Sequence, residues 1–262
     1  MTSIIKDSRF LLVHSHDRKV TGTNIQFTVP FNDADLLQSN IVKVCPKSVT
    51  FPNFLYNVHS DHNNKFNFKD TTSGHSVSGT VPVGFYTWET LLDYFNGQLY
   101  LAGSNTVISG EYGVNGKLKL KTSQGQVKFY TDDDIEKTAL LMMLGIPETE
   151  YAIGTVLTEM TYPATFNWNN EVIITSSLTL KAGTSSSLGI STINFYDVIT
   201  LGDTPYSQTK SQHCACEVIN SFTYKVAVPN SAISFRLLTK YGKLQQMPPN
   251  AEWSMICKIF IT

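Results

Sequence analysis

Charged residues are scarce in this sequence. Only 16% of its 262 residues are Asp, Glu, Lys or Arg, whereas an average globular protein has about 25%. The formal net charge is −1 at pH 7, and general nucleic-acid binders need clustered Lys and Arg to contact phosphates. The composition therefore disfavours a nucleic-acid binder, and it favours a subunit whose surface is partly covered by neighbouring subunits.

Long apolar runs are also absent. The run near the start, Phe10 to Val13, has four residues, which is shorter than the apolar core of about 7 to 15 residues in a signal peptide. No stretch approaches the ~20 apolar residues that a transmembrane helix requires. We therefore expect a soluble protein that is made without secretion and has no membrane-spanning segment.

Cysteine occurs at four positions, Cys45, Cys214, Cys216 and Cys257. Cys214 and Cys216 are separated by one residue, which is not the C-x2-C spacing of a zinc knuckle. We expect buried, reduced thiols, with Cys257 on the apolar face of the final strand. His213, which precedes the close pair, leaves open a soft-metal site or a reactive thiol.

Motifs of enzyme chemistry are missing. The sequence has no G-x-S-x-G, P-loop or dinucleotide-binding glycine motif. His14 and His16 would lie on one face of a strand, as the metal ligands of cupins do, but no Glu follows a few residues later. The acidic residues at 132–134 lack the glycine and the distal Glu of a calcium loop. We therefore expect no enzymatic activity, no cofactor, no small-molecule substrate and no bound metal.

Short alternating strands dominate the rest of the chain. Residues 24–31 and 252–262 alternate apolar and polar side chains with the period of two that is typical of half-buried strands. Further β runs lie at 40–51 (broken by Pro46), 63–68, 171–180, 193–201, 216–228 and 233–240, with a hairpin-like pair at 117–121 and 127–130. The pattern predicts an all-β fold, a single jelly-roll sandwich with two short helices and loop insertions. We expect one domain over residues 1–262, with an N-terminal arm at 1–8 and a surface-projecting insertion at 181–213.

One segment, residues 81–99, has helical periodicity instead. Thr87 can cap a helix by accepting a hydrogen bond from a free amide of the first turn. Large apolar side chains then recur at helical spacing; they are Trp88, Leu91, Leu92, Phe95 and Leu99. This stripe predicts a helix that closes the end of the sandwich. We expect a second short helix after residues 132–134, ending at Gly145 and Pro147.

Several blocks occur in an order that resembles a known family. They are SVTFPNFLYNV at 48–58, NNKFNF at 63–68, TVPVGFYTWETLLDYFNGQL at 80–99 and LLMMLGI at 140–146, with a β-rich C-terminal half. The series resembles the minor capsid, or penton, proteins of virophages, polinton-like viruses and related double-stranded DNA viruses. The resemblance spans roughly residues 8–262.

This resemblance implies a virion structural protein. It implies a single jelly roll that forms a homopentamer at the icosahedral vertices, contacts a double jelly-roll major capsid protein and is assembled inside the host cell. The family-like positions specify the fold and have no catalytic role; they are Pro52, Asn53, Tyr56, Asn57, Pro82, Gly84, Tyr86, Thr87, Leu91, Leu92, Leu144 and Gly145. Residues 171–180 depart from the family pattern, because no Tyr or His precedes the Ser of VIITSSL, and this leaves the register of that strand open.

Two other functions stay open. A receptor- or glycan-binding head of a spike or fibre would use the loops at 181–192 and 202–213, whose Ser, Thr, Gln and Tyr206 side chains suit sugar hydroxyls. A cupin-like metalloprotein would use His14 and His16.

Overall fold

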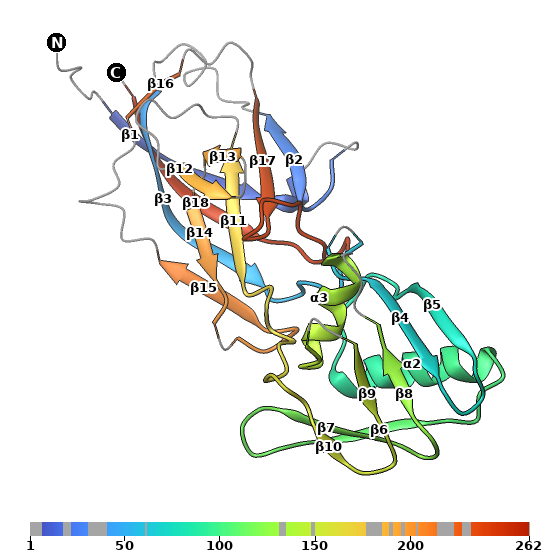
Figure 1. Ribbon diagram of the computed structural model, residues 1–262. Coiled ribbons are helices and arrows are strands. Elements are labelled where there is room, and N and C mark those ends of the chain that lie inside the picture. Colours follow the sequence, from blue (N-terminus) through green and yellow to red (C-terminus); the bar gives the residue numbers. More distant parts are fainter. Residues whose placement is uncertain are drawn as a thin grey trace. The chain divides into compact units, whose positions relative to one another are not determined.

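The computed structural model describes residues 7–17, 22–30, 41–60, 62–130, 135–147, 150–176, 185–188, 191–194, 197–202, 204–213, 223–226 and 232–261 (Figure 1). The chain divides into two compact units, and the single jelly-roll domain over 1–262 stays a prediction. Unit 1 comprises Met1–Leu55 and Asn169–Thr262, and unit 2 comprises Tyr56–Trp168. Unit 2 is therefore a single continuous insertion in unit 1.

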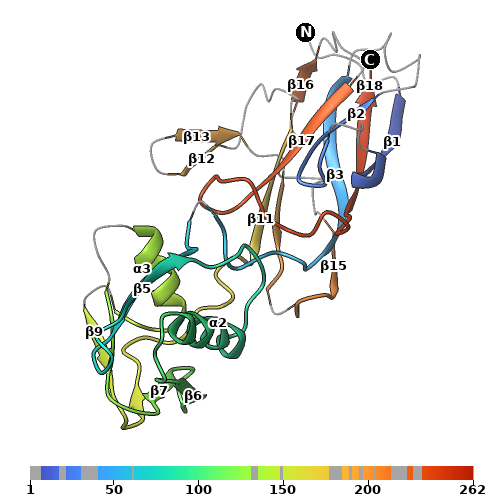
Figure 2. The ribbon, with the colours of Figure 1, turned by 90° about the vertical axis from the view of Figure 1, so that its right-hand side faces the viewer.

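Unit 1 contains two antiparallel sheets (Figure 2). The strands of the first sheet are, in spatial order, β1 (Asp7–His14), β18 (Ser254–Ile261), β3 (Ile41–Pro52) and β15 (Thr209–His213), and β16 (Thr223–Val226) also pairs with β3. The strands of the second are β14 (Asp197–Thr200), β11 (Glu171–Ser176), β17 (Ala232–Leu238) and β2 (Gln26–Pro30). The register that the sequence left open is now defined, because Ile174 of β11 pairs with Asp197 and with Leu237.

One hydrophobic core holds both sheets of unit 1 together. Its largest fully buried side chains are Phe51 of β3, Phe235 of β17 and Trp253, which precedes β18. Val172 and Ile174 add the inner face of β11. The prediction of an all-β jelly-roll sandwich is confirmed, and Cys257 is buried in its core as expected.

Two details of unit 1 differ from the sequence prediction. β3 continues through Pro46, because a register shift against β18 lies there and a bulge tolerates the missing amide N–H. Thr209–His213, expected in a surface loop, forms β15 and pairs with β3. Of the expected arm at 1–8, only Asp7 and Ser8 are described, and they begin β1.

The remaining short elements of unit 1 are the 3-10 turn η1 (Ser15–Asp17) and the hairpin of β12 (Ser185–Leu188) and β13 (Ser191–Asn194). This hairpin falls inside the insertion expected at 181–213. Half of the proposed glycan loop at 181–192, namely 181–184 and 189–190, lies outside the described residues.

Among the described residues, unit 2 has two small antiparallel sheets and two α-helices. Its first sheet contains, in order, β5 (Ser76–Thr80), β4 (Lys65–Asp70), β8 (Val127–Phe129) and β9 (Tyr151–Ile153), and its second contains β10 (Thr158–Glu159), β7 (Leu118–Thr122) and β6 (Ile108–Tyr112). The helices are α2 (Trp88–Leu101) and α3 (Ile135–Met143). The hairpin predicted from 117–121 and 127–130 is wrong, because β7 and β8 belong to different sheets.

Helix α2 begins as predicted but packs elsewhere. Thr87 caps it in a capping box with Thr90, in which each side chain accepts the backbone N–H of the other residue. Its buried residues are Leu91, Leu92, Phe95 and Leu99, and they belong to the core of unit 2, with Phe66, Phe68 and Phe129. The prediction that this helix closes the jelly roll is therefore wrong. No helix in the described part of the chain is both long and apolar enough to cross a membrane.

Candidate functional site

Asn57 lies at the centre of a buried hydrogen-bond junction in unit 2. Its Nδ2 donates to the carbonyl oxygens of Tyr86 at 2.7 Å and Phe166 at 3.2 Å, and its Oδ1 accepts the Tyr86 amide at 2.8 Å. Its backbone carbonyl accepts from Trp168 Nε1 and Asn63 Nδ2, each at 2.8 Å. Asn57 is only 2% exposed, so both polar atoms of its side chain are matched inside the protein, as burial requires.

Gly84 brings a second family-like segment to the same junction. Its amide donates to Val58 O at 3.2 Å, and its carbonyl accepts from the amides of Val58 at 3.0 Å and Asn57 at 3.1 Å. Burial raises the pKa of Tyr86, and Tyr94 raises it further. The structure thus joins Asn57, Gly84 and Tyr86, which come from two separate blocks of the sequence.

Pro52 and Asn53 have a different location, at the end of β3 in unit 1. Asn53 Nδ2 donates to Thr204 O at 2.6 Å. The backbone of Asn53 donates to Gln208 O at 2.7 Å and accepts from Ser207 N at 2.8 Å. Asn53 therefore fixes the segment 204–208, which leads into β15.

Gly145 ends the turn after α3. Its φ of +82° lies in the left-handed region, and a Cβ at this position would overlap the Tyr162 carbonyl oxygen. Tyr162 N also donates to Gly145 O at 3.0 Å. Only glycine satisfies both the conformation and the close approach. Leu144 beside it is fully buried.

The other family-like positions also form structural contacts or lie beside the core. Tyr56 O accepts from His59 Nε2 at 2.8 Å, Pro82 is exposed next to buried Val81, and Leu91 is buried on α2. Asn53, Tyr56, Asn57 and Gly84 connect backbone segments, whereas Leu91 and Leu144 pack in the core of unit 2. This geometry supports the proposal that they specify the fold.

Asp70 is a buried charged group that sequence analysis did not single out. It is fully buried at the end of β4, and its carboxylate accepts from Ser104 Oγ at 2.5 Å, Thr106 Oγ1 at 2.9 Å, Ser73 Oγ at 2.7 Å and Thr72 N at 2.9 Å. Burial alone would raise the pKa of Asp70, but these four hydrogen bonds outweigh it and hold the pKa far below its ordinary value. The carboxylate thereby joins the turn after β4 to the loop after α2.

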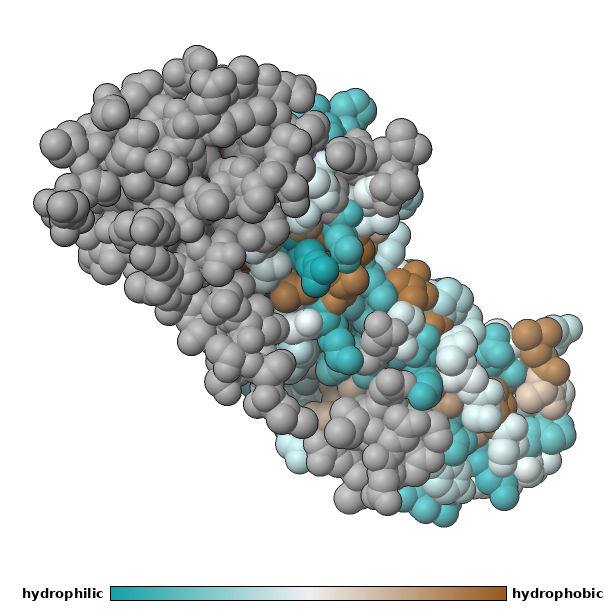
Figure 3. Space-filling model, turned by 90° about the horizontal axis from the view of Figure 1, so that it is seen from above, coloured by the Kyte–Doolittle hydropathy of each residue, from teal (hydrophilic) through white to brown (hydrophobic). Residues whose placement is uncertain are grey.

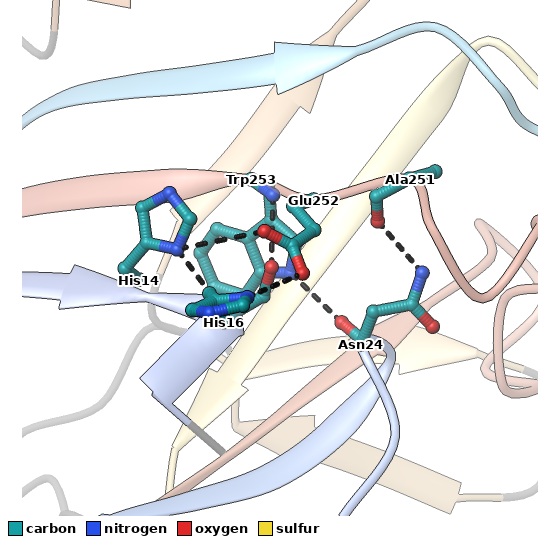
Figure 4. Close-up of polar contacts among 7 residues, drawn as sticks. His14, His16, Asn24, Ala251, Glu252 and Trp253 are labelled. Carbon is teal, nitrogen blue, oxygen red and sulfur yellow. Dashed lines mark hydrogen bonds and ion pairs between the residues drawn. The ribbon is translucent and has the colours of Figure 1, made fainter.

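His14 and His16 are joined by a third residue that lies far away in the sequence (Figure 4). His16 Nδ1 lies 3.0 Å from Glu252 Oε1, and His14 Nδ1 lies 4.0 Å from Glu252 Oε2. His14 Nδ1 also accepts the His16 amide at 3.0 Å. A Glu does accompany the two His residues, but it comes from the segment before β18 and not from the residues that follow them.

The corner beneath these His residues is held by buried polar contacts (Figure 4). Ser15 and Trp253 exchange two hydrogen bonds of 2.9 Å, and Trp253 Nε1 donates to Asn24 O at 2.9 Å. Asn24 Nδ2 in turn donates to Pro248 O and Ala251 O, each at 2.7 Å. Neighbouring turns therefore fix the positions of His14 and His16.

The described residues contain no group of three or more His, Cys, Asp or Glu arranged to hold a metal ion. In the cluster of His14, His16 and Glu252, the Nδ1 atom of each His contacts other atoms of the protein. His213 is exposed on β15, and Cys214 and Cys216 lie outside the described residues, so the proposed soft-metal site at 213–216 is not tested.

Two packed antiparallel sheets around one core, with a continuous insertion, define a jelly-roll protein. Among solved structures, the chain is similar to the crystal structure of the mavirus penton protein, with a TM-score of 0.53 and 11% identity over 98% of this chain and 100% of that one. It is also similar to a chain in the cryo-EM structure of the Sputnik virophage, with a TM-score of 0.49 and 10% identity over 97% and 98% of the two chains. No protein-family model and no curated protein matches the sequence.

Proposed function

We propose that this chain is a structural protein of a virion, namely the minor capsid (penton) protein that forms homopentamers at the icosahedral vertices. The observation that carries the proposal is the alignment with the mavirus penton protein over 98% of this chain and 100% of that one. Such coverage includes unit 2 as well as the jelly roll, so the likeness extends beyond the common two-sheet core.

The composition supports the same proposal. With 16% charged residues, the chain suits a subunit that buries part of its surface against copies of itself and against a double jelly-roll major capsid protein. In this proposal the whole chain is one jelly-roll capsid protein into which unit 2 is inserted, and it functions in the capsid without catalysis.

Light scattering after size exclusion, combined with electron microscopy of the purified full-length protein, tests the proposal. A penton protein is expected to form rings with five-fold symmetry. A strictly monomeric protein at high concentration would contradict the vertex assignment, as would rings of another symmetry.

A further inference from the structure

The edge strands of unit 2 differ in how they are protected. Edge strands present unpaired N–H and C=O groups, and native proteins block such groups to avoid unwanted pairing. Asn96 of α2 occupies the outward backbone groups at the start of β6, because its side-chain amide donates to Ile108 O at 2.9 Å and accepts from Ile108 N at 2.7 Å, and β6 also carries the charged residue Glu111. β9 and β10 have only three and two residues, which is too short for extensive pairing.

β5 has none of these protections along most of its length. Its sequence, SVSGT, contains no charged residue and no proline, and it pairs with β4 in regular register from Ser76 to Thr80. It lies at the outer edge of its sheet (Figure 1).

The hydrogen-bond pattern identifies which groups of β5 face outward. Asp70 N donates to His75 O at 2.9 Å, and Val81 N donates to Asn64 O at 2.6 Å. Because bonded pairs alternate along an antiparallel ladder, residues 75, 77, 79 and 81 bond β4. The N–H and C=O groups of residues 76, 78 and 80 therefore point away from the sheet.

One of these outward backbone groups already has a hydrogen-bond partner. Tyr94 Oη donates to Thr80 O at 2.9 Å, and this is the only bond to the outward backbone groups of residues 76, 78 and 80 in the part of the chain that the structure describes. Five outward backbone groups remain at this edge: the N–H and C=O of Ser76, the N–H and C=O of Ser78, and the N–H of Thr80. They are enough to pair with an extended segment.

The outer face beside this edge is basic. Lys65 lies across from Thr80 and Lys69 across from Ser76 on neighbouring β4, and Lys128 of β8 lies across from Lys69. Glu150 pairs with Lys128 at 2.8 Å. Like charges directly opposite each other are unfavourable in a sheet, so Lys69, which faces Lys128, would be stabilised by an added negative charge.

An added strand would supply that charge at the right distance. Side chains of a strand next to β5 would lie about 10 Å from the backbone of β4, within the reach of flexible Lys side chains and about one Debye length. Among the coloured residues of the face in Figure 3, hydrophobic side chains are scattered among hydrophilic ones.

We propose that the free edge of β5 binds an extended, acidic segment of another polypeptide, which adds to the sheet as a fifth strand. A second copy of β5 fits less well, because it would have no negative charge to offer and would pair around a two-fold axis, unlike the head-to-tail contacts of a five-membered ring.

The test uses the full-length protein and a fluorescent, capped peptide of alternating Glu and Val. Ser78→Pro removes an outward N–H without removing a bond to β4, and Ser78→Ala is its matched control. We expect the peptide to bind wild type and S78A, and to bind S78P at least about tenfold more weakly. In wild type, the bound peptide should slow hydrogen exchange in residues 76–80.

Charge is tested separately, and by a variant that leaves the ladder intact. Lys69→Glu should weaken the Glu–Val peptide about tenfold, and a Lys–Val peptide should bind wild type more weakly than the Glu–Val peptide. The proposal is overturned if the Glu–Val peptide does not bind, if S78P binds it as tightly as S78A, or if both peptides bind equally. Self-association that S78P abolishes would assign the edge to a second copy instead.

Discussion

Ser104 Oγ donates to Asp70 Oδ2 at 2.5 Å inside unit 2. Ser104 belongs to the loop after α2 and Asp70 to the end of β4, and both are buried. Thr106 and Thr72 donate to the same carboxylate. The turn after β4 and the loop after α2 thus both depend on one ionised side chain.

Replacing Asp70 by Asn should destabilise the protein by about 2 kcal/mol or more, because four donors lose a charged acceptor in a buried site. Urea unfolding, followed by a signal from unit 2, would measure the decrease in the free energy of unfolding. Asp93→Asn, on the exposed face of α2, is the control and should change the free energy of unfolding by less than about 0.5 kcal/mol. Equal effects of the two substitutions would contradict the assignment.

Asp70 should also make stability depend on pH in the acid range. Because its pKa in the folded state lies below its ordinary value of 3.8, its contribution is complete above that value and is lost as the pH falls from 3.8 toward the folded-state pKa. The stability difference between wild type and D70N should therefore stay constant from neutral pH to about pH 5 and shrink below pH 4. A difference that grows with acidity would contradict this prediction.

Gly145→Ala should be much more costly than Gly116→Ala. Both glycines have positive φ, +82° and +68°, but a Cβ meets the Tyr162 carbonyl only at Gly145, and nothing lies within 4 Å of one at Gly116. Strain alone costs about 1 kcal/mol, so G116A measures strain and the excess in G145A measures the overlap. Thermal unfolding of the two variants provides the comparison, and equal shifts would show that the overlap relaxes without cost.

Asn57→Ala should destabilise unit 2 by about 1 to 3 kcal/mol, because it leaves part-buried backbone groups of Tyr86 and Phe166 without partners. Trp168 reports on the same junction, since its indole donates to the Asn57 carbonyl, and its emission should shift toward that of an exposed indole. Asn67→Ala, on the outer face of β4, is the control. An unchanged midpoint of unfolding in N57A would contradict a structural role for the junction.

The corner near His14 allows buried and exposed contacts to be compared. Asn24→Ala removes two hydrogen bonds from a side chain that is 4% exposed, and should cost about 2 kcal/mol. Glu252→Gln removes the negative charge beside His14 and His16, whose side chains are 39% and 74% exposed, and should cost less than about 1 kcal/mol. Chemical denaturation at neutral pH would rank the two, and the reverse order would contradict the argument.

Local patterns predicted the elements well. Thr87 and the stripe from Leu91 to Leu99 defined α2, and Gly145 defined the end of α3, because caps and periodicity depend on neighbours in the chain. Alternation predicted β2, β4 and β18 for the same reason.

Long-range placement could not be predicted in the same way. An amphipathic stripe is equally consistent with the core of unit 1 and the core of unit 2. The sequence therefore predicts that α2 closes the jelly roll, although it packs in unit 2. Nothing near β7 and β8 indicates that the turn between them changes sheets. Glu252 lies 236 residues from His16, and Asp70 resembles any acidic residue at a strand end until its donors from residues 104 and 106 are placed around it.

The contacts from Trp168 and Phe166 back to Asn57 tie the last residues of the insertion to its first ones. A segment whose two ends are tied in this way can be lengthened, shortened or replaced without re-routing a strand of the jelly roll, because its closure does not depend on its contents. Residues 56–168 therefore form a cassette that a single recombination event can exchange, while the strands of the jelly roll on either side of it in the sequence keep their order.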